Sequence, residues 1–205
     1  MRVLVFGDSI AYGAWDSAGG WVERLKSYAH QKTINSPTEY KVQVLNLGVG
    51  GHSSEDILSR LEAEITSRTS KSWPFVFIFY FGTNDARTYD GVEQNSLENY
   101  LENTENIINI AKQYSDRLLF IRPIPVGTDG VDLRGAVYSN QKIEYYGEKQ
   151  LKLLERLGVA SLDLWNDFVA NKDSFFCFDG LHPNDNGHDY IFKNVKEKIA
   201  EMYKI

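Results

Sequence analysis

The chain has 205 residues, of which 42% are hydrophobic and 24% are charged, a size that suits one domain with a full-sized core. Its 22 basic and 28 acidic side chains leave a formal net charge of −6, so no basic surface for nucleic acid is expected. The single cysteine, Cys177, excludes an internal disulfide and a cysteine metal cluster, and no apolar run is long enough to span a bilayer.

The chain begins with a short apolar run at residues 1–5 that is typical of a buried strand. Gly7-Asp8-Ser9 follows, so that Ser9 lies where the strand ends and the chain turns. At the carboxyl end of a parallel strand, a side chain faces the crevice where α/β proteins bind ligands. Ser9 is therefore a candidate nucleophile, which needs a base, a group that orients the base, and oxyanion donors. Because no charged leader precedes this strand, a cytoplasmic location is favoured.

Apolar runs and residues spaced by three and four alternate along the rest of the chain, and they predict strands and helices respectively. The expected strands cover residues 1–5, 40–47, 75–81, 117–122 and 159–164. The expected helices cover residues 20–31, 57–65, 97–111 and 138–157, and a last helix that Asn184 or Asp185 caps and that continues to Met202. Residues 33–40 and 123–137 are expected to be loops, the second one irregular because it holds two prolines and three glycines.

This alternation predicts a single α/β domain over residues 1–205, with a five-stranded parallel sheet covered by helices on both faces. Right-handed crossovers then bring the carboxyl ends of the strands to one edge. The loops at Ser9, Gly51, Asn84 and 179–182 are expected at that edge.

Asp179 and His182 are separated by two residues in a loop just before the last helix. A tight loop of this length lets the carboxylate accept a hydrogen bond from Nδ1 of His182, which leaves Nε2 free to take the proton of Ser9. An isolated Asp-x-x-His is more often a turn with a surface histidine. Beside a serine at a strand end, the catalytic interpretation is favoured.

Two further loops offer donors for an oxyanion. Asn84 directly follows the strand at 75–81 and carries a side-chain amide, although an Asn-Asp turn after a strand is common. Gly51 precedes the helix that Ser53 can cap, so its N–H would lie near the positive end of that helix. The glycines around it also simply allow the turn. The third donor would be the N–H of Ser9.

Four blocks together resemble the SGNH hydrolases, also called the GDSL lipase/esterase family. They are Gly-Asp-Ser near the N-terminus, a glycine after the second strand, Gly-x-Asn-Asp after the third, and Asp-x-x-His before the last helix. They occur in family order across residues 7–182, with Ile10 where the family name has leucine. Gly51 is chosen because it stands five residues after Asn46, the usual family spacing.

The resemblance implies a flavodoxin-like three-layer α/β/α fold and serine ester hydrolysis without a metal or cofactor. It assigns the nucleophile to Ser9, the oxyanion donors to Gly51 and Asn84 beside the Ser9 N–H, and the supporting pair to Asp179 and His182.

Five side chains near these loops are candidates for substrate binding. They are Tyr12, Trp15, His52, Tyr89 and Pro125. The aromatic residues among them could instead cover the core, and His52 could face solvent. The loop at 123–137 is the expected site of substrate selection because it is longer than an ordinary connection.

The expected function is hydrolysis of a small-molecule carboxylic ester, either a short-chain ester or a sugar O-acetyl group. The alternative is a thioesterase or lysophospholipase that acts on longer acyl chains. A non-catalytic binding domain on the same scaffold is the third interpretation, and the complete set of Ser9, Asn84, Asp179 and His182 argues against it.

Overall fold

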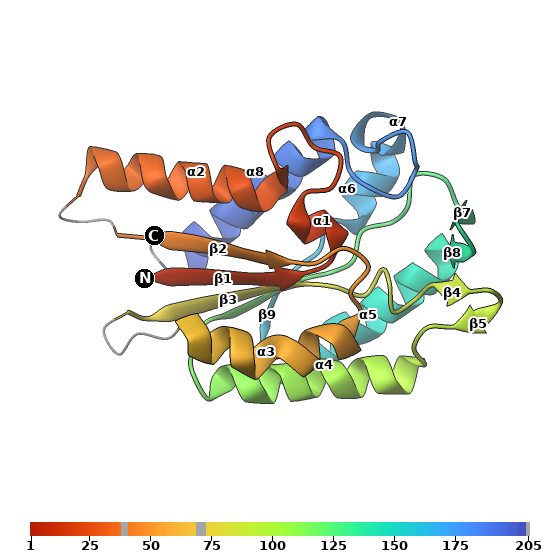
Figure 1. Cartoon of the computed structure of the whole chain (residues 1–205), viewed down its shortest axis with the longest axis horizontal. Coiled ribbons are helices and arrows are strands. Elements are labelled where there is room, and N and C mark those ends of the chain that lie inside the picture. The colour runs from red at the N-terminus through yellow and green to blue at the C-terminus, as the bar shows by residue number, and fades with distance from the viewer. Residues whose placement is uncertain (38–40, 69–72, 204–205) are drawn as a thin grey trace.

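A parallel sheet of five strands runs through the centre of the protein (Figure 1). The computed structural model describes residues 1–37, 41–68 and 73–203. The strand order is β2-β1-β3-β6-β9, which is the order of flavodoxin-like sheets when the five strands are counted in sequence. The strands are β1 (Arg2–Gly7), β2 (Gln43–Gly48), β3 (Phe75–Tyr80), β6 (Leu118–Ile121) and β9 (Ala160–Leu162).

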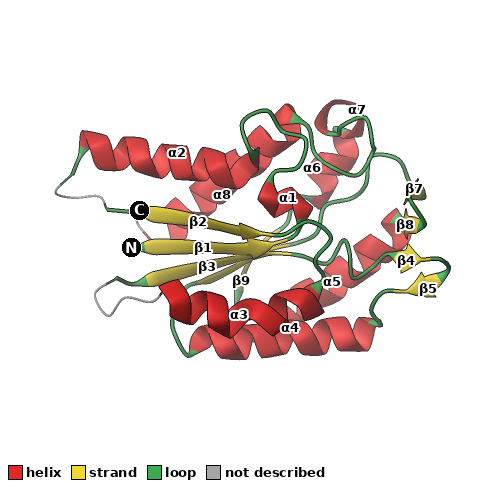
Figure 2. Cartoon of the chain, viewed as in Figure 1, coloured by secondary structure: helices red, strands yellow, loops and turns green. Residues whose placement is uncertain are grey.

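Helices cover both faces of this sheet (Figure 2). One face packs against α2 (Gly20–Asn35), α6 (Trp165–Ala170) and α8 (Asp185–Tyr203). The other face packs against α3 (Ser54–Arg68), α4 (Leu97–Lys112) and α5 (Asn140–Arg156). Two helices of four residues, α1 (Ser9–Tyr12) and α7 (Lys172–Phe175), lie in the connections. The three-layer α/β fold expected from the sequence is confirmed.

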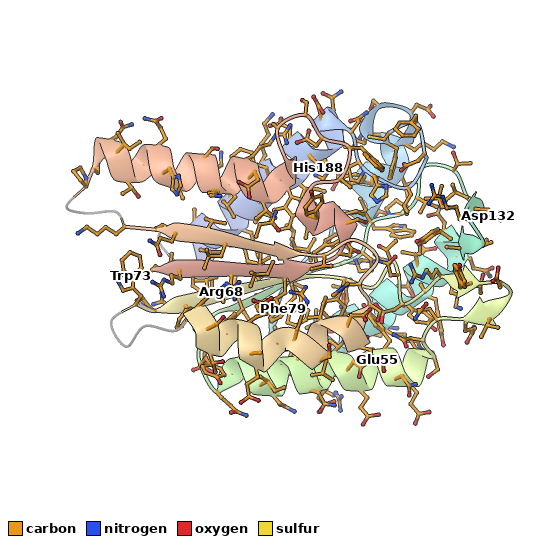
Figure 3. All side chains as sticks on the ribbon, in the orientation of Figure 1. Glu55, Arg68, Trp73, Phe79, Asp132 and His188 are labelled. Atoms are coloured by element: carbon orange, nitrogen blue, oxygen red, sulfur yellow. The ribbon has the colours of Figure 1, made fainter. Side chains whose placement is uncertain are left out.

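The central strand β3 shows why both faces need a helical layer. All six of its side chains are buried. Phe77 and Phe79 face the layer that contains Ile57 of α3, and Phe79 is labelled on this side of the sheet in Figure 3. Val76 and Ile78 alternate with them and face the opposite layer. Since burial of one such side chain stabilises the fold by about 1.5–3 kcal/mol, β3 anchors both halves of the core.

Two glycines let α1 pack directly on the ends of β1 and β2. A Cβ atom at Gly7 would lie 2.5 Å from Cβ of Ala11, and one at Gly48 would lie 2.3 Å from the main-chain nitrogen of Tyr12. Real Cβ atoms do not approach so closely, so a side chain at either position would push α1 away from the sheet. The close approach places α1, whose first residue is Ser9, at the carboxyl ends of the strands (Figure 1).

A second, antiparallel sheet lies beyond the carboxyl ends of the main strands (Figure 2). Its strand order is β5-β4-β8-β7, with β4 (Thr88–Tyr89), β5 (Val92–Glu93), β7 (Val131–Leu133) and β8 (Ala136–Tyr138). The expectation of an irregular loop over 123–137 is therefore wrong for its second half. The strands were missed because two or three residues are too few to show an alternating pattern.

Most other expected elements agree with the structure to within a few residues. Helix α2 is an exception because it continues to Asn35, where a polar loop was expected. Its last turn includes a hydrogen bond of 3.2 Å between the side chains of Gln31 and Asn35. Tyr40, where the second strand was expected to begin, lies outside the described residues. No helix within the described ranges is long and apolar enough to cross a membrane.

Candidate active site

Ser9 is the first residue of α1, and Asp8 caps that helix. Oδ1 of Asp8 accepts the N–H of Ile10 at 2.8 Å. The helix ends at Gly13, whose φ of 93° is in the left-handed region and whose N–H donates to the Ser9 carbonyl at 3.0 Å. The Asp-Ser-Ile segment therefore forms one tight turn of helix, in which the Asp8 side chain satisfies the N–H of Ile10. This turn holds the Ser9 hydroxyl at the open edge of the sheet.

The structure brings Ser9, His182 and Asp179 into one chain of hydrogen bonds. Nε2 of His182 lies 2.8 Å from Oγ of Ser9, and Nδ1 lies 2.6 Å from Oδ2 of Asp179. The side chains of His182 and Asp179 are 11% and 8% exposed. The relay can pass a proton from Ser9 to His182 while the carboxylate fixes the ring, which is the geometry of serine hydrolases.

The Asp179–His182 loop is held by main-chain donors as well. Oδ1 of Asp179 accepts the N–H groups of Leu181 and His182, each at 3.0 Å. Burial by itself raises the pKa of Asp179, but the hydrogen bonds from His182 and Leu181 outweigh it and lower the pKa below its usual value. Asp179 is therefore ionised at neutral pH, as an orienting carboxylate must be.

Asn84 is buried beside Ser9 and its amide is held from both ends. Nδ2 donates to the carbonyl of His52 at 3.0 Å. Oδ1 accepts from the guanidinium of Arg87 at 3.1 Å and from the hydroxyl of Tyr138 at 3.2 Å. The two donors on Oδ1 fix which end of the amide carries the N–H₂ group. That group also donates to Oδ2 of the buried Asp8 at 3.5 Å, and Asn84 lines the cleft at Ser9. Tyr138 belongs to β8 of the small sheet, which thus supports the site directly.

The turn after β2 presents free main-chain donors to the same space. The N–H of Gly48 donates to Oδ1 of Asn46 in β2, that of Val49 to the carbonyl of Gly7 in β1, and that of His52 to the carbonyl of Val49. The N–H groups of Gly50 and Gly51 have no hydrogen-bond partner among the residues that the structure describes, and neither does that of Ser9. Both glycines line the cleft at Ser9. Each of these three N–H groups is therefore available to a bound anion.

An open cleft of about 450 Å³ contains the Ser9 hydroxyl. Of the five substrate-binding candidates, Tyr12 and Trp15 line it and are 62% and 61% exposed. His52, Tyr89 and Pro125 are not among its lining residues. The sequence prediction missed five side chains that do line it: Ala14, Val49, Leu133, Tyr138 and Leu181.

Local structure explains why some predicted residues do not line the cleft and why some lining residues were not predicted. Pro125 is buried, His52 contributes its carbonyl to Asn84, and Tyr89 belongs to β4 of the small sheet. Leu133 and Tyr138 come from β7 and β8, whose strands were not expected. Leu181 lies inside the Asp-x-x-His motif, so its place at the cleft was readable from that motif.

Two buried carboxylates lie beneath Ser9 and Asn84. Asp85 accepts hydrogen bonds from the N–H and hydroxyl of Ser54 and from the amide of Asn95. Burial raises the pKa of Asp85, and burial with the nearby Asp85 charge raises the pKa of Asp8 to about 7 despite hydrogen bonds from Ile10 and Ala11. Both carboxylates hold loops of the site through these hydrogen bonds. No group of three or more His, Cys, Asp or Glu side chains that could hold a metal occurs in the described part of the chain.

The fold is similar to solved structures of hydrolases. The lipase/acylhydrolase from Enterococcus faecalis aligns with a TM-score of 0.76 at 23% identity, over 97% of this chain and 94% of that one. The acetylxylan esterase Axe2 from Geobacillus stearothermophilus aligns with a TM-score of 0.73 at 16% identity, over 97% and 93%. Similarity at this level of identity shows a shared fold and leaves function to the site.

Sequence comparison adds two curated relatives and a family. The N-acylneuraminate cytidylyltransferase of Escherichia coli is 28% identical over 182 residues, which is 88% of this chain and 38% of that protein. The uncharacterized lipoprotein YqeF of Bacillus subtilis is 29% identical over 131 residues, which is 60% of this chain and 49% of that protein. The chain thus spans about half the length of this relative. The model of the GDSL-like Lipase/Acylhydrolase family matches residues 5–190, which include all four motif blocks. The chain therefore belongs to the GDSL-like lipase/acylhydrolase family, as its motifs indicated.

Proposed function

We propose that this protein hydrolyses carboxylic esters of small molecules through a covalent acyl-enzyme on Ser9. The observation that carries the proposal is the unbroken hydrogen-bond chain from Ser9 through His182 to Asp179. Family membership supports the same reaction class. A non-catalytic binding domain would not need a buried imidazole within 2.8 Å of a serine hydroxyl.

The reaction begins when Oγ of Ser9 attacks the ester carbonyl and its proton moves to Nε2 of His182. Asp179 stabilises the imidazolium through Nδ1–H. When the tetrahedral intermediate collapses, the bond to the alcohol breaks and His182 returns the proton to the leaving oxygen. A water molecule then repeats the sequence on the acyl-enzyme and releases the acid and the free serine.

The negative charge on the carbonyl oxygen needs donors at the cleft. The proposed donors are the N–H of Ser9, the N–H of Gly51 and Nδ2 of Asn84. Gly51 is preferred over Gly50 on the motif spacing, and both N–H groups are free. The loss of one such donor typically costs about 3–4 kcal/mol of transition-state stabilisation, so Asn84→Ala is expected to be strongly impaired.

The substrate is expected to carry a short acyl group, such as the acetyl group of an O-acetylated sugar. The cleft at Ser9 is open, and Tyr12, Trp15 and Gly48 line both it and a neighbouring groove that Asp16, Glu23 and Asn46 also line. An open, partly polar groove suits a polar alcohol or sugar better than a long alkyl chain. The fold similarity to an acetylxylan esterase is consistent with this choice.

A series of p-nitrophenyl esters tests the proposal. The wild-type protein is expected to turn over the acetate and butyrate and to lose kcat/KM as the acyl chain lengthens, whereas Ser9→Ala gives only background hydrolysis. A maximum at long acyl chains rather than at the acetate would favour the thioesterase or lysophospholipase alternative. Turnover by Ser9→Ala at the wild-type rate would remove the nucleophile assignment.

The cytoplasmic location stays a prediction of the sequence.

A further inference from the structure

Trp15 lies in the segment between α1 and α2, and its indole reaches the Asp179–His182 loop. Nε1–H donates a hydrogen bond of 2.9 Å to Oδ2 of Asp179, the same oxygen that accepts from Nδ1 of His182. The indole also meets the imidazole edge-on, with ring centroids 6.1 Å apart and an interplanar angle of 88°. One side chain from the segment that follows Ser9 therefore contacts both members of the pair that activates Ser9.

With Trp15 in place, each oxygen of the Asp179 carboxylate has two donors. Oδ1 accepts the main-chain N–H groups of Leu181 and His182, and Oδ2 accepts from His182 and Trp15. A carboxylate with both oxygens fully engaged has one favoured orientation. Without the indole, Oδ2 would keep only the imidazole as a partner, and water could compete for its free lone pairs.

The backbone at Trp15 is held in a conformation that tryptophan rarely adopts. Its φ of 65° is in the left-handed region, which is unfavourable for a bulky residue. The neighbouring residues fix it there, because Asp16 accepts the N–H of Gly20 and pairs with Arg24. Ser17 donates to Asp185 at the start of α8 at 2.8 Å. A strained residue that its surroundings hold in place is a reason to look for a function.

Core packing does not explain this conformation. The side chain is 61% exposed, and one of its ring neighbours, Phe178, is 90% exposed with ring centroids 6.2 Å apart. The constrained backbone thus keeps the Trp15 indole at the surface. There the indole N–H makes its hydrogen bond to Asp179.

We propose that Trp15 is a positioning residue, whose N–H holds the Asp179 carboxylate in the orientation that His182 requires, in addition to forming a wall of the cleft. The proposal deepens the proposed function and rests on it. Trp15 acts through Asp179 and takes no part in bond making or breaking.

The test compares Trp15→Phe with Phe178→Leu. Trp15→Phe keeps an aromatic wall but removes the N–H, so kcat on p-nitrophenyl acetate is expected to fall about tenfold while KM stays within about twofold. The acid limb of the kcat/KM profile is expected to move up by about half a pH unit, because Asp179 without this donor directs more of its charge toward His182. Phe178→Leu removes a neighbouring exposed ring that donates nothing, and kcat and the acid limb should match the wild type.

A double-mutant cycle with Asp179→Ala separates positioning from a general effect on the fold. If Trp15 acts through Asp179, Trp15→Phe changes kcat less than about twofold in the Asp179→Ala background. A full tenfold loss in that background overturns the proposal, as does a wild-type kcat for Trp15→Phe or an effect confined to KM. A lack of ester turnover by the wild-type protein would instead contradict the proposed function. The comparison of wild type with Ser9→Ala tests that function without any change at Trp15.

A measurement on protein that keeps Trp15 covers the case in which Trp15→Phe does not fold. The four tryptophans of the chain give four indole N–H signals in the NMR spectrum of protein labelled with ¹⁵N at tryptophan. Asp179→Ala is expected to move one signal upfield and to increase its exchange with water, because that indole loses its acceptor. Four unchanged signals would show that the hydrogen bond is absent in solution and would overturn the proposal.

Discussion

Two aspartates flank Ser9 in the fold, and they lie in opposite environments. Asp8 lies at the buried end of β1 and is 1% exposed as a residue. Asp179 is half-buried in the loop before α8, bonded to His182, which lines the open cleft. Burial dominates at Asp8 and raises its pKa to about 7. At Asp179, donors from His182 and Leu181 overcome burial and lower the pKa.

The difference shows that adjacency to the nucleophile does not decide which carboxylate can serve the reaction. Asp179 is ionised and engages His182, so it can stabilise an imidazolium. Asp8 receives main-chain N–H groups of α1 and has no histidine partner within the described ranges, so it shapes the turn that carries Ser9. The same substitution, Asp→Asn, should therefore have different consequences at the two positions.

Asp179→Asn is expected to have the largest effect. An amide cannot accept from Nδ1 and compensate the imidazolium charge in the way a carboxylate does, so kcat on p-nitrophenyl acetate should fall by about 10³–10⁴. Urea unfolding should show a moderate loss of stability with the protein still folded, because the amide N–H₂ faces two donors that a carboxylate oxygen accepted. A loss below about tenfold would break the comparison, since Asp179 would then be no more important to the reaction than Asp8.

Asp8→Asn is expected to change how stability depends on pH. Because the folded-state pKa of Asp8 is raised from 3.8 to about 7, the folded protein holds a proton there that the unfolded chain releases. The stability that this proton contributes is fully present below pH 3.8 and is lost as the pH rises through 7. The free energy of unfolding of the wild type is expected to fall by at most about 4 kcal/mol through this loss.

Urea unfolding of wild type and Asp8→Asn at pH values from 4 to 8 measures this effect, because the asparagine has no proton to lose. The free energy of unfolding of the variant, relative to wild type, should increase across this range. Its kcat should stay within about tenfold of wild type. A constant difference in unfolding free energy would contradict the raised pKa.

Tyr138→Phe is expected to have the smallest effect. The variant removes one of two donors to Oδ1 of Asn84, and Arg87 keeps the other. The net value of one neutral hydrogen bond, about 1 kcal/mol, predicts a loss in kcat of about fivefold. Tyr145→Phe, an exposed tyrosine on α5, is the matched control. An unchanged kcat would show that Tyr138 does not hold Asn84.

The main sheet was predictable because β1, β2, β3 and β6 have four to six residues, which is long enough to show an apolar run or an alternating pattern. The three residues of β9 were recognised only as part of the longer run 159–164. The small sheet was not expected, although one signal for it was present. Asp90-Gly91 joins β4 to β5 with φ values of 47° and 79°, and an Asp-Gly pair is a strong hairpin signal. Arg134-Gly135 makes the same kind of turn between β7 and β8.

The sequence also indicated which residues would meet at the cleft, because motif spacing places Ser9, Asn84 and the Asp179–His182 loop at strand and helix ends. Their catalytic roles stay proposals. The substrate-binding candidates were chosen by nearness in sequence, which does not say where a side chain points. This is why Pro125 proved to be buried, and why the contribution of Tyr138, from an unexpected strand, was missed.

The hydrogen-bond relay at Ser9 is tested most directly by covalent labelling with a fluorophosphonate, followed by intact-mass and peptide analysis. The account predicts one phosphonyl group per wild-type chain, located on the peptide that contains Ser9. Ser9→Ala should remain unlabelled, and His182→Ala should react at least about 10³-fold more slowly because its hydroxyl has no base. Wild-type protein that stays unlabelled, or that is labelled elsewhere than Ser9, would contradict the account.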